Sequence, residues 1–93
     1  MPRFDAGIFF PKLRKYVITD SHLRFVERDD FSGMPKLETL DLSNNEIEEI
    51  PADALLDSSE LIDFYIDNNK IKTLPENLLV NAQAFQRLKA ANN

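Results

Sequence analysis

Residues 37–45 read LETLDLSNN, with leucine at the first, fourth and sixth positions and asparagine at the ninth. The same pattern returns as LIDFYIDNN at 61–69 and as FQRLKAANN at 85–93, and a looser copy, LRKYVITDS, occupies 13–21. Successive copies begin 24 residues apart. A fixed period of this length predicts a solenoid, in which each repeat is one structural unit stacked on its neighbours.

Aligning the copies gives six columns that are apolar in every repeat, although only 43% of the chain is hydrophobic. We therefore expect residues 1–93 to form a single repeat domain. Its expected parts are the tail of a preceding repeat at 1–12, repeats at 13–36, 37–60 and 61–84, and a truncated repeat at 85–93.

Each repeat divides into two halves with different patterns. Residues 39–42 and 63–66 alternate polar and apolar side chains, which is the spacing of a short strand with one buried face. The second half opens at Pro51 or Pro75, and proline suits the first turn of a helix. We predict a turn or two of α- or 3₁₀-helix over 52–58 and 76–82, and parallel strands side by side in successive repeats.

Asparagine holds the ninth position in three repeats, at Asn45, Asn69 and Asn93. A chain that turns inward after a strand leaves backbone groups without partners, and an amide side chain can both donate to and accept from them. These residues therefore predict a ladder of structural asparagines. Ser21 takes the position in the first repeat and can do part of the same work, while we expect the preceding asparagines, at 44, 68 and 92, to face solvent.

The pattern L-x-x-L-x-L-x-x-N-x-I-x-x-I/L-P-x-x-x-L resembles that of leucine-rich repeat proteins, over about residues 13–93. Repeats of 24 residues with proline at this place resemble the extracellular subclass. The resemblance implies an α/β solenoid with a curved parallel sheet on its concave face and short helical or 3₁₀ segments on its convex face. It also implies an extracellular setting, secreted or in a receptor ectodomain, among matrix proteins and factors of innate immunity.

Three features depart from that subclass: the chain has no cysteine for the usual caps, no Asn-x-Ser/Thr sequon, and repeats that begin and end uncapped. We expect a fragment of a longer protein or the product of an incomplete gene model, and we expect no signal peptide within these 93 residues. Because uncapped ends expose core, we also expect the isolated chain to be weakly stable or to self-associate through those ends.

Composition argues against several other functions. The net charge of −5 disfavours nucleic-acid binding, and no apolar run reaches the 18 or so residues that span a bilayer. His22 is the only histidine, and cysteine is absent, so neither a metal pair nor a nucleophile with its base is indicated. Calcium binding by Asp41, Asp63 and Asp67 is disfavoured, because their spacing does not match a calcium-ligand loop. We expect no enzymatic activity, no cofactor and no metal.

The polar residues of the strand halves face outward, and there we predict a partner-binding patch. Its centre is acidic and aromatic and its two ends are basic; the residues are Asp41, Asp63, Tyr65 and Asp67, with Lys15 at one end and Arg87 and Lys89 at the other. Tyrosine is enriched at protein interfaces. The patch suits a protein with a basic surface; the alternative is a solvated sheet face that only keeps the protein soluble.

We therefore expect a protein-binding module, part of a larger extracellular recognition protein. The alternatives are a structural spacer or dimerisation segment without a ligand of its own, and, more remotely, part of an enzyme whose catalysis lies elsewhere. Phe25 occupies a position that holds Glu49 and Thr73 in later repeats. It is either an exposed contact or a local packing variant, and the sequence favours the latter.

Overall fold

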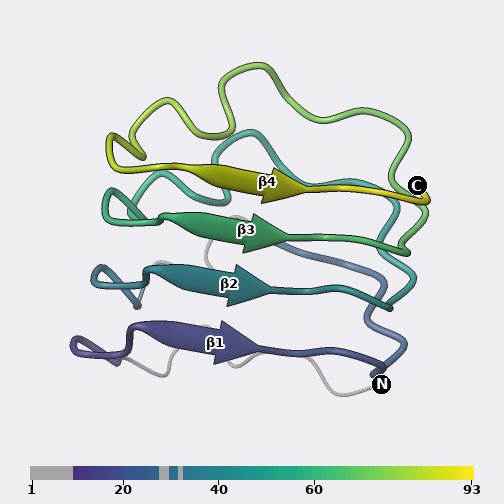
Figure 1. Ribbon diagram of the computed structural model, residues 1–93, viewed down its shortest axis with the longest axis horizontal. Coiled ribbons are helices and arrows are strands. Elements are labelled where there is room, and N and C mark those ends of the chain that lie inside the picture. Colours follow the sequence, from purple (N-terminus) through teal and green to yellow (C-terminus); the bar gives the residue numbers. More distant parts are fainter. Residues whose placement is uncertain (1–9, 28–29, 32) are drawn as a thin grey trace.

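The computed structural model describes residues 10–27, 30–31 and 33–93. Four strands of three residues each lie side by side in one parallel sheet, in the order β1-β2-β3-β4 (Figure 1). Their bounds are β1 Lys15–Val17, β2 Thr39–Asp41, β3 Asp63–Tyr65 and β4 Arg87–Lys89. The expected tail of a preceding repeat, at 1–12, lies mostly outside the described residues.

The strand register follows the sequence period. Thr39 pairs with Lys15 and Asp63, and the other strand positions align in the same way, so every residue lies beside its counterpart one repeat away. Parallel neighbours need a long connection, which each repeat supplies by returning across the opposite side of the coil. The predicted parallel solenoid is confirmed.

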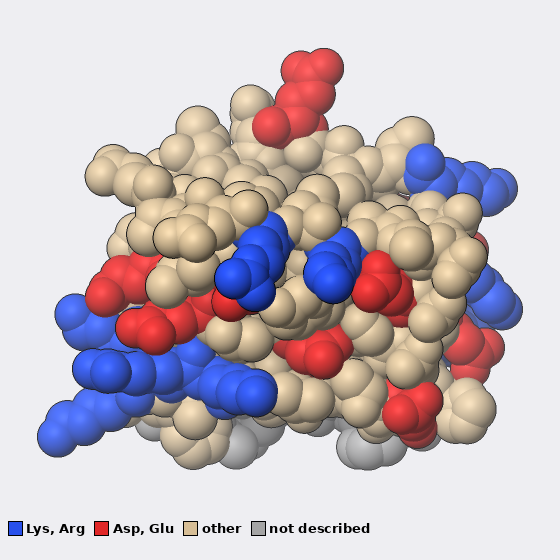
Figure 2. Space-filling view, in the orientation of Figure 1, with Lys and Arg blue, Asp and Glu red and all other residues tan. Residues whose placement is uncertain are grey.

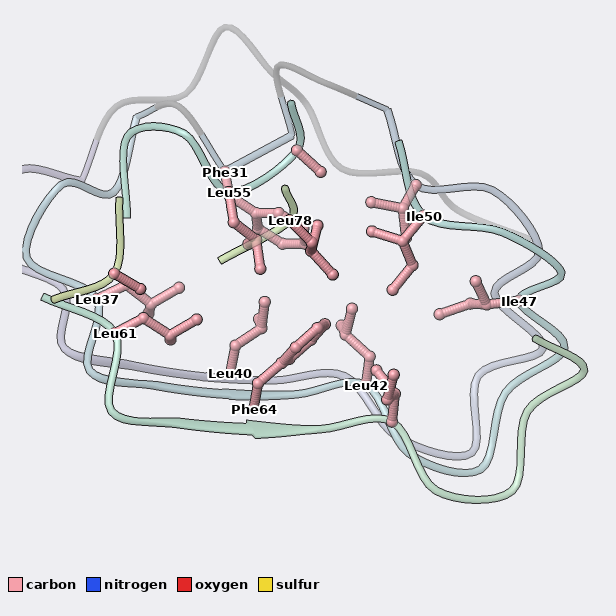
Figure 3. Packing of buried hydrophobic residues seen from close by; sticks show 14 of the residues in the cluster. Phe31, Leu37, Leu40, Leu42, Ile47, Ile50, Leu55, Leu61, Phe64 and Leu78 are labelled. Carbon is pink, nitrogen blue, oxygen red and sulfur yellow. The ribbon is translucent and has the colours of Figure 1, made fainter. Parts of the chain in front are cut away.

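The core lies inside the coil, between the sheet and the returning segments (Figure 3). Leu40, Leu42 and Phe64 point inward from the strand side and meet Ile50 and Leu55 from the opposite side. Leu37 and Leu61 close one flank of the coil and Ile47 closes the other. These side chains are at most 2% exposed, as the apolar columns predict.

The two outer repeats contribute less to the core than the two inner ones. On β1, Tyr16 is only partly buried; its burial, together with the charge of Asp30, raises the pKa of its hydroxyl. On β4, Leu88 belongs to the same column as Leu40 and Phe64 but is 42% exposed. Within the described residues no further strand lies beyond β4, so one side of Leu88 has nothing to pack against.

The predicted helical segments on the convex side are wrong in form. Residues 52–57 and 76–81 are successive turns, and the described residues contain no helix. Hydrogen bonds run from Ala54 N to Pro51 O and from Ser58 N to Leu55 O, at 3.1 Å each, but not from consecutive residues as a 3₁₀-helix requires. A helix advances only 1.5–2.0 Å per residue, whereas separate turns cross the coil in fewer residues.

No described helix could cross a bilayer.

Candidate protein-binding face

The outward-facing side chains of the four strands form two parallel rows across the sheet. Asp63 lies between Thr39 and Arg87 in one row, and Tyr65 lies between Asp41 and Lys89 in the other. Lys15 stands at the β1 end of the first row. The predicted patch residues of β2, β3 and β4 are thus neighbours, and Asp67 lies two residues beyond the end of β3. Tyr65 is half-buried, so one part of its side chain packs against the protein while another part presents surface.

Asp63 is not a free carboxylate. Its Oδ1 lies 3.6 Å from the Nε of Arg87, and its side chain is only 20% exposed. That same oxygen is buried and has no hydrogen-bond partner within the described residues. A buried carboxylate oxygen is costly without a compensating charge, and Arg87 supplies one across the strand pair. Asp63 and Arg87 therefore contribute a neutral pair to the face.

Asp41 and Asp67 each use one oxygen to hold the backbone beyond the strands. Oδ1 of Asp41 accepts from Ser43 N at 3.0 Å, and Oδ1 of Asp67 accepts from Ala91 N at 2.7 Å. The Oδ2 of each carboxylate accepts no hydrogen bond from the described residues, so it is open to a ligand. These two aspartates, on either side of Tyr65 in the chain, carry the open negative charge of the face.

The face as a whole carries both signs of charge. Figure 2 shows Lys and Arg side chains close to Asp and Glu side chains across the sheet side of the molecule. The exposed lysine and arginine positions include Lys15 on β1 and Arg87 and Lys89 on β4. Val17 is 46% exposed beside Asp41 and adds an apolar contact that the sequence argument did not single out, although an apolar residue at an outward position was a usable signal.

The asparagines at the ninth positions hold the turn that follows each strand. Asn45 Oδ1 accepts from Ser21 N and Leu23 N, both at 3.0 Å. Its Nδ2 donates to the carbonyl oxygens of Ile18, at 2.8 Å, and Leu42, at 3.0 Å. Each amide thus ties its own repeat to the one before it.

The other two asparagines of this column repeat that arrangement. Asn69 accepts from Ile47 N, at 3.1 Å, and Asn93 from Ile71 N, at 3.1 Å. Asn69 Nδ2 donates to Leu42 O at 3.0 Å, and Asn93 Nδ2 donates to Ile66 O at 2.9 Å. The Oγ of Ser21 makes one such bond, to Thr19 O at 2.9 Å.

A second, exposed asparagine column runs beside the first. Asn68 Nδ2 donates to Asn44 Oδ1 at 2.7 Å, and Asn92 Nδ2 donates to Asn68 Oδ1 at 3.0 Å. All three have φ between 58° and 60°, and Asp20, their counterpart in the first repeat, has φ 55°. Asn and Asp tolerate this left-handed conformation better than other non-glycine residues. The sharp turn explains why asparagine occurs twice in succession.

His22, Glu46 and Lys70 form a third column, in which His22 and Lys70 are exposed and Glu46 is partly exposed. His22 Nδ1 lies 2.9 Å from Glu46 Oε2, and Lys70 Nζ lies 3.6 Å from Glu46 Oε1. The hydrogen bond with His22 is the largest cause of a lowered pKa for the Glu46 carboxyl, and the positive charge of Lys70 adds to it. His22 is thus a solvated turn residue with a partner in the next repeat.

Among the residues that the structure describes, no group of three or more His, Asp or Glu side chains is placed to hold a metal ion.

Phe25 is not a packing variant. Its side chain is 64% exposed, and its neighbour Val26, at 5%, fills the core position instead. The Cζ of Arg24 lies 5.7 Å from the centre of the Phe25 ring. The preference for a local packing role was wrong because Phe25 stands at an outward position of the flank, where neighbouring repeats carry polar residues.

Comparison with known proteins agrees with this geometry. The model of the leucine-rich repeat family matches residues 11–71 of the 93. Among solved structures, the chain is similar to one in the complex of Toll with Spätzle from Drosophila, described as a molecular hub in development and innate immunity, with TM-score 0.84 and 22% identity. The alignment covers 89% of this chain and 11% of that one. No curated protein matches. The chain belongs to the leucine-rich repeat family.

Proposed function

We propose that this chain is the protein-binding surface of a larger extracellular recognition protein, and that the partner docks on the concave sheet face. Tyr65 is the central contact. Asp41 and Asp67 contribute carboxylates for basic groups of the partner. Lys15 and Lys89 limit the acidic area at its two ends, and the Asp63–Arg87 pair adds no net charge. The observation that carries the proposal is the placement of half-buried Tyr65 between a carboxylate and an ammonium group.

Two physical arguments support this reading. A tyrosine whose ring is already restrained loses little side-chain entropy on binding and offers both an apolar ring and a hydroxyl. Asp41 and Asp67 are fixed by their own hydrogen bonds to backbone N–H groups, so they too are ordered before a partner arrives. The solved structure that this chain resembles in fold is a complex of two proteins, which supports protein binding as the proposed role.

The test uses a displayed library of random 12-residue peptides as the probe, selected against the immobilised chain. The changed protein carries Asp41→Asn, Tyr65→Thr and Asp67→Asn. Asparagine keeps the Oδ1 acceptor that each backbone N–H needs, so the fold is retained while charge and ring are removed. We expect the enriched peptides to be rich in Lys and Arg and to bind the triple variant at least tenfold more weakly.

The matched control carries Leu56→Thr, Asp57→Asn and Glu76→Gln. It also removes two carboxylates and one large side chain, but from exposed turns on the other side of the coil. Peptides should bind this control as they bind the unchanged chain. The proposal would be contradicted if both variants lost peptide affinity equally, or if the selection enriched neutral or acidic peptides.

A structural spacer or dimerisation segment is the second candidate. In that function a neighbouring strand stacked on β4 would cover Leu88, which is 42% exposed. Under that function no peptide family would be enriched on the sheet face, and the same selection therefore separates the two.

A further inference from the structure

We propose a second docking site on the flank of the coil, where Phe25 and two glutamates receive an arginine or lysine side chain of a protein partner. This site, called here the Phe25 hollow, is lined by residues 24–27 of one repeat and by Glu48, Glu49 and Pro51 of the next. Its volume is about 340 Å³. It lies outside the two rows of the concave sheet face.

The repeat pattern explains how the hollow forms. Ile47 and Ile50 point into the core from this flank, so the two residues between them face outward (Figure 3). The same spacing places Arg24 and Phe25 outward between two buried residues, Leu23 and Val26. Stacked repeats therefore set Phe25 beside Glu49, its counterpart 24 residues later.

The exposure of Phe25 points to a ligand. The ring is 64% exposed, and its counterparts Glu49 and Thr73 are polar. Isolated apolar residues on a surface are ordinary, but this one lines a hollow whose other walls include two carboxylates. An aromatic face attracts a cation, and carboxylates beside it add a Coulombic attraction.

The charges around the ring select the class of partner. Arg24 already lies over the ring, with its Cζ 5.7 Å from the centroid, which shows that the face accepts a guanidinium group. Glu48 and Glu49 are exposed, and neither forms an ion pair within the described residues. Two unpaired carboxylates against one arginine leave a local excess of negative charge. A partner segment with Arg or Lys next to an aliphatic residue complements that excess and the apolar wall at Pro51.

The test is a titration of the ¹⁵N-labelled chain with the dipeptide Ac-Arg-Ile-NH₂, followed by NMR. The matched ligand is Ac-citrulline-Ile-NH₂, which has nearly the same shape without the charge. We expect saturable amide shifts in residues 24–27 and 48–50, with a Kd of roughly 1–10 mM, as suits so small a ligand. The citrulline peptide should bind at least threefold more weakly.

Phe25→Thr installs the residue that the third repeat has at this position, and the exposed site gives no reason for unfolding. We expect a Kd at least threefold higher for the arginine peptide, and a similar rise in the double variant Glu48→Gln, Glu49→Gln. Tyr65→Thr should leave this titration unchanged, so failure here and failure on the sheet face are distinguishable. Equal binding of both peptides, or no saturable shift, would overturn the proposal. Shifts of residues 24–27 and 48–50 that grow with protein concentration in the absence of peptide would overturn it too, because they would show a second copy of the chain in the hollow.

Discussion

Replacing the ladder asparagines by alanine should destabilise the protein to unequal degrees, with Asn45→Ala costing more than Asn69→Ala. The two side chains have the same exposure, 7% each, and make similar hydrogen bonds. They differ in what remains after the amide is removed. An orphaned buried backbone group costs about 1–3 kcal/mol, whereas a carbonyl that keeps a second donor loses far less.

Loss of the Asn45 amide leaves four backbone groups without another hydrogen bond in the described chain; they are the N–H groups of Ser21 and Leu23 and the carbonyls of Ile18 and Ser43. Of the two N–H groups, only that of Leu23 makes a fully buried hydrogen bond. The N–H of Ser21 is partly buried, so water can replace part of its lost hydrogen bond. We expect a loss of about 4 kcal/mol in the free energy of unfolding. A chain of this length has roughly 5–14 kcal/mol in all.

Loss of the Asn69 amide leaves only the Ile47 N–H without a partner. The carbonyl of Leu42 keeps Asn45 as a donor, and that of Ile66 keeps Asn93. We expect about 2 kcal/mol for Asn69→Ala, so the two variants should differ by about 2 kcal/mol.

The assay is urea unfolding followed by circular dichroism, with sulfate added to every sample to keep the weakest variant folded. Asn44→Gly is the control. It removes an exposed asparagine next to Asn45, and glycine accepts the left-handed φ of 60° without strain, so stability should change by less than about 0.5 kcal/mol. Equal losses for both ladder variants, or a greater loss for Asn69→Ala, would refute the reasoning.

Three further predictions follow from single side chains. Ser58 is fully buried and its hydroxyl has no hydrogen-bond partner among the described residues, so Ser58→Ala should add about 1 kcal/mol to the free energy of unfolding and raise Tm by roughly 4–8 °C in calorimetry; a lower Tm would contradict this. Phe64→Ala should cost about 3–5 kcal/mol in urea unfolding but Leu88→Ala only about 1 kcal/mol, because Leu88 is 42% exposed in the same column; similar costs would refute that ranking. His22→Ala should raise the lowered pKa of Glu46 towards its ordinary value of 4.5, as read by carboxyl NMR titration. Because the folded pKa lies below the unfolded one, Glu46 stabilises the fold above about pH 4.5 and loses that effect as pH falls through the folded pKa, so an unchanged titration in His22→Ala would disprove the link.

The fold was largely predictable because the 24-residue repeat can be recognised directly in the sequence. A column such as Tyr16, Leu40, Phe64 and Leu88 becomes a row of inward side chains once each repeat lies beside the next. The convex segments were harder. Pro51 and the acidic residues after it suit the start of a helix. Each repeat must also cross the width of the coil in a few residues, which favours separate turns. Helix propensity is a property of the local sequence and carries no information about that distance.

The candidate site was predictable in position but not in charge state. Two-residue alternation placed Asp63 and Tyr65 outward, and the 24-residue period placed Arg87 beside Asp63. The sequence argument nevertheless counted these two as separate charges, whereas the structure brings them to 3.6 Å as a pair. The role of Asn44 and Asn68 was also missed, since solvent exposure was expected but the left-handed backbone was not. For Phe25, the sequence already showed an aromatic residue in a column that is otherwise polar. Only the exposure of its side chain in the structure decided between an exposed contact and a local packing variant.

The most direct test of the central claim, that the concave sheet face binds a protein partner, is an NMR measurement on the chain bound to a peptide from the displayed library. Isotope-filtered spectra would report which protein protons lie within about 5 Å of the peptide. The account predicts contacts from the peptide to the ring of Tyr65 and to the methyl groups of Val17. Contacts to Leu56 and Val80 on the opposite side of the coil, with none to Tyr65, would contradict it.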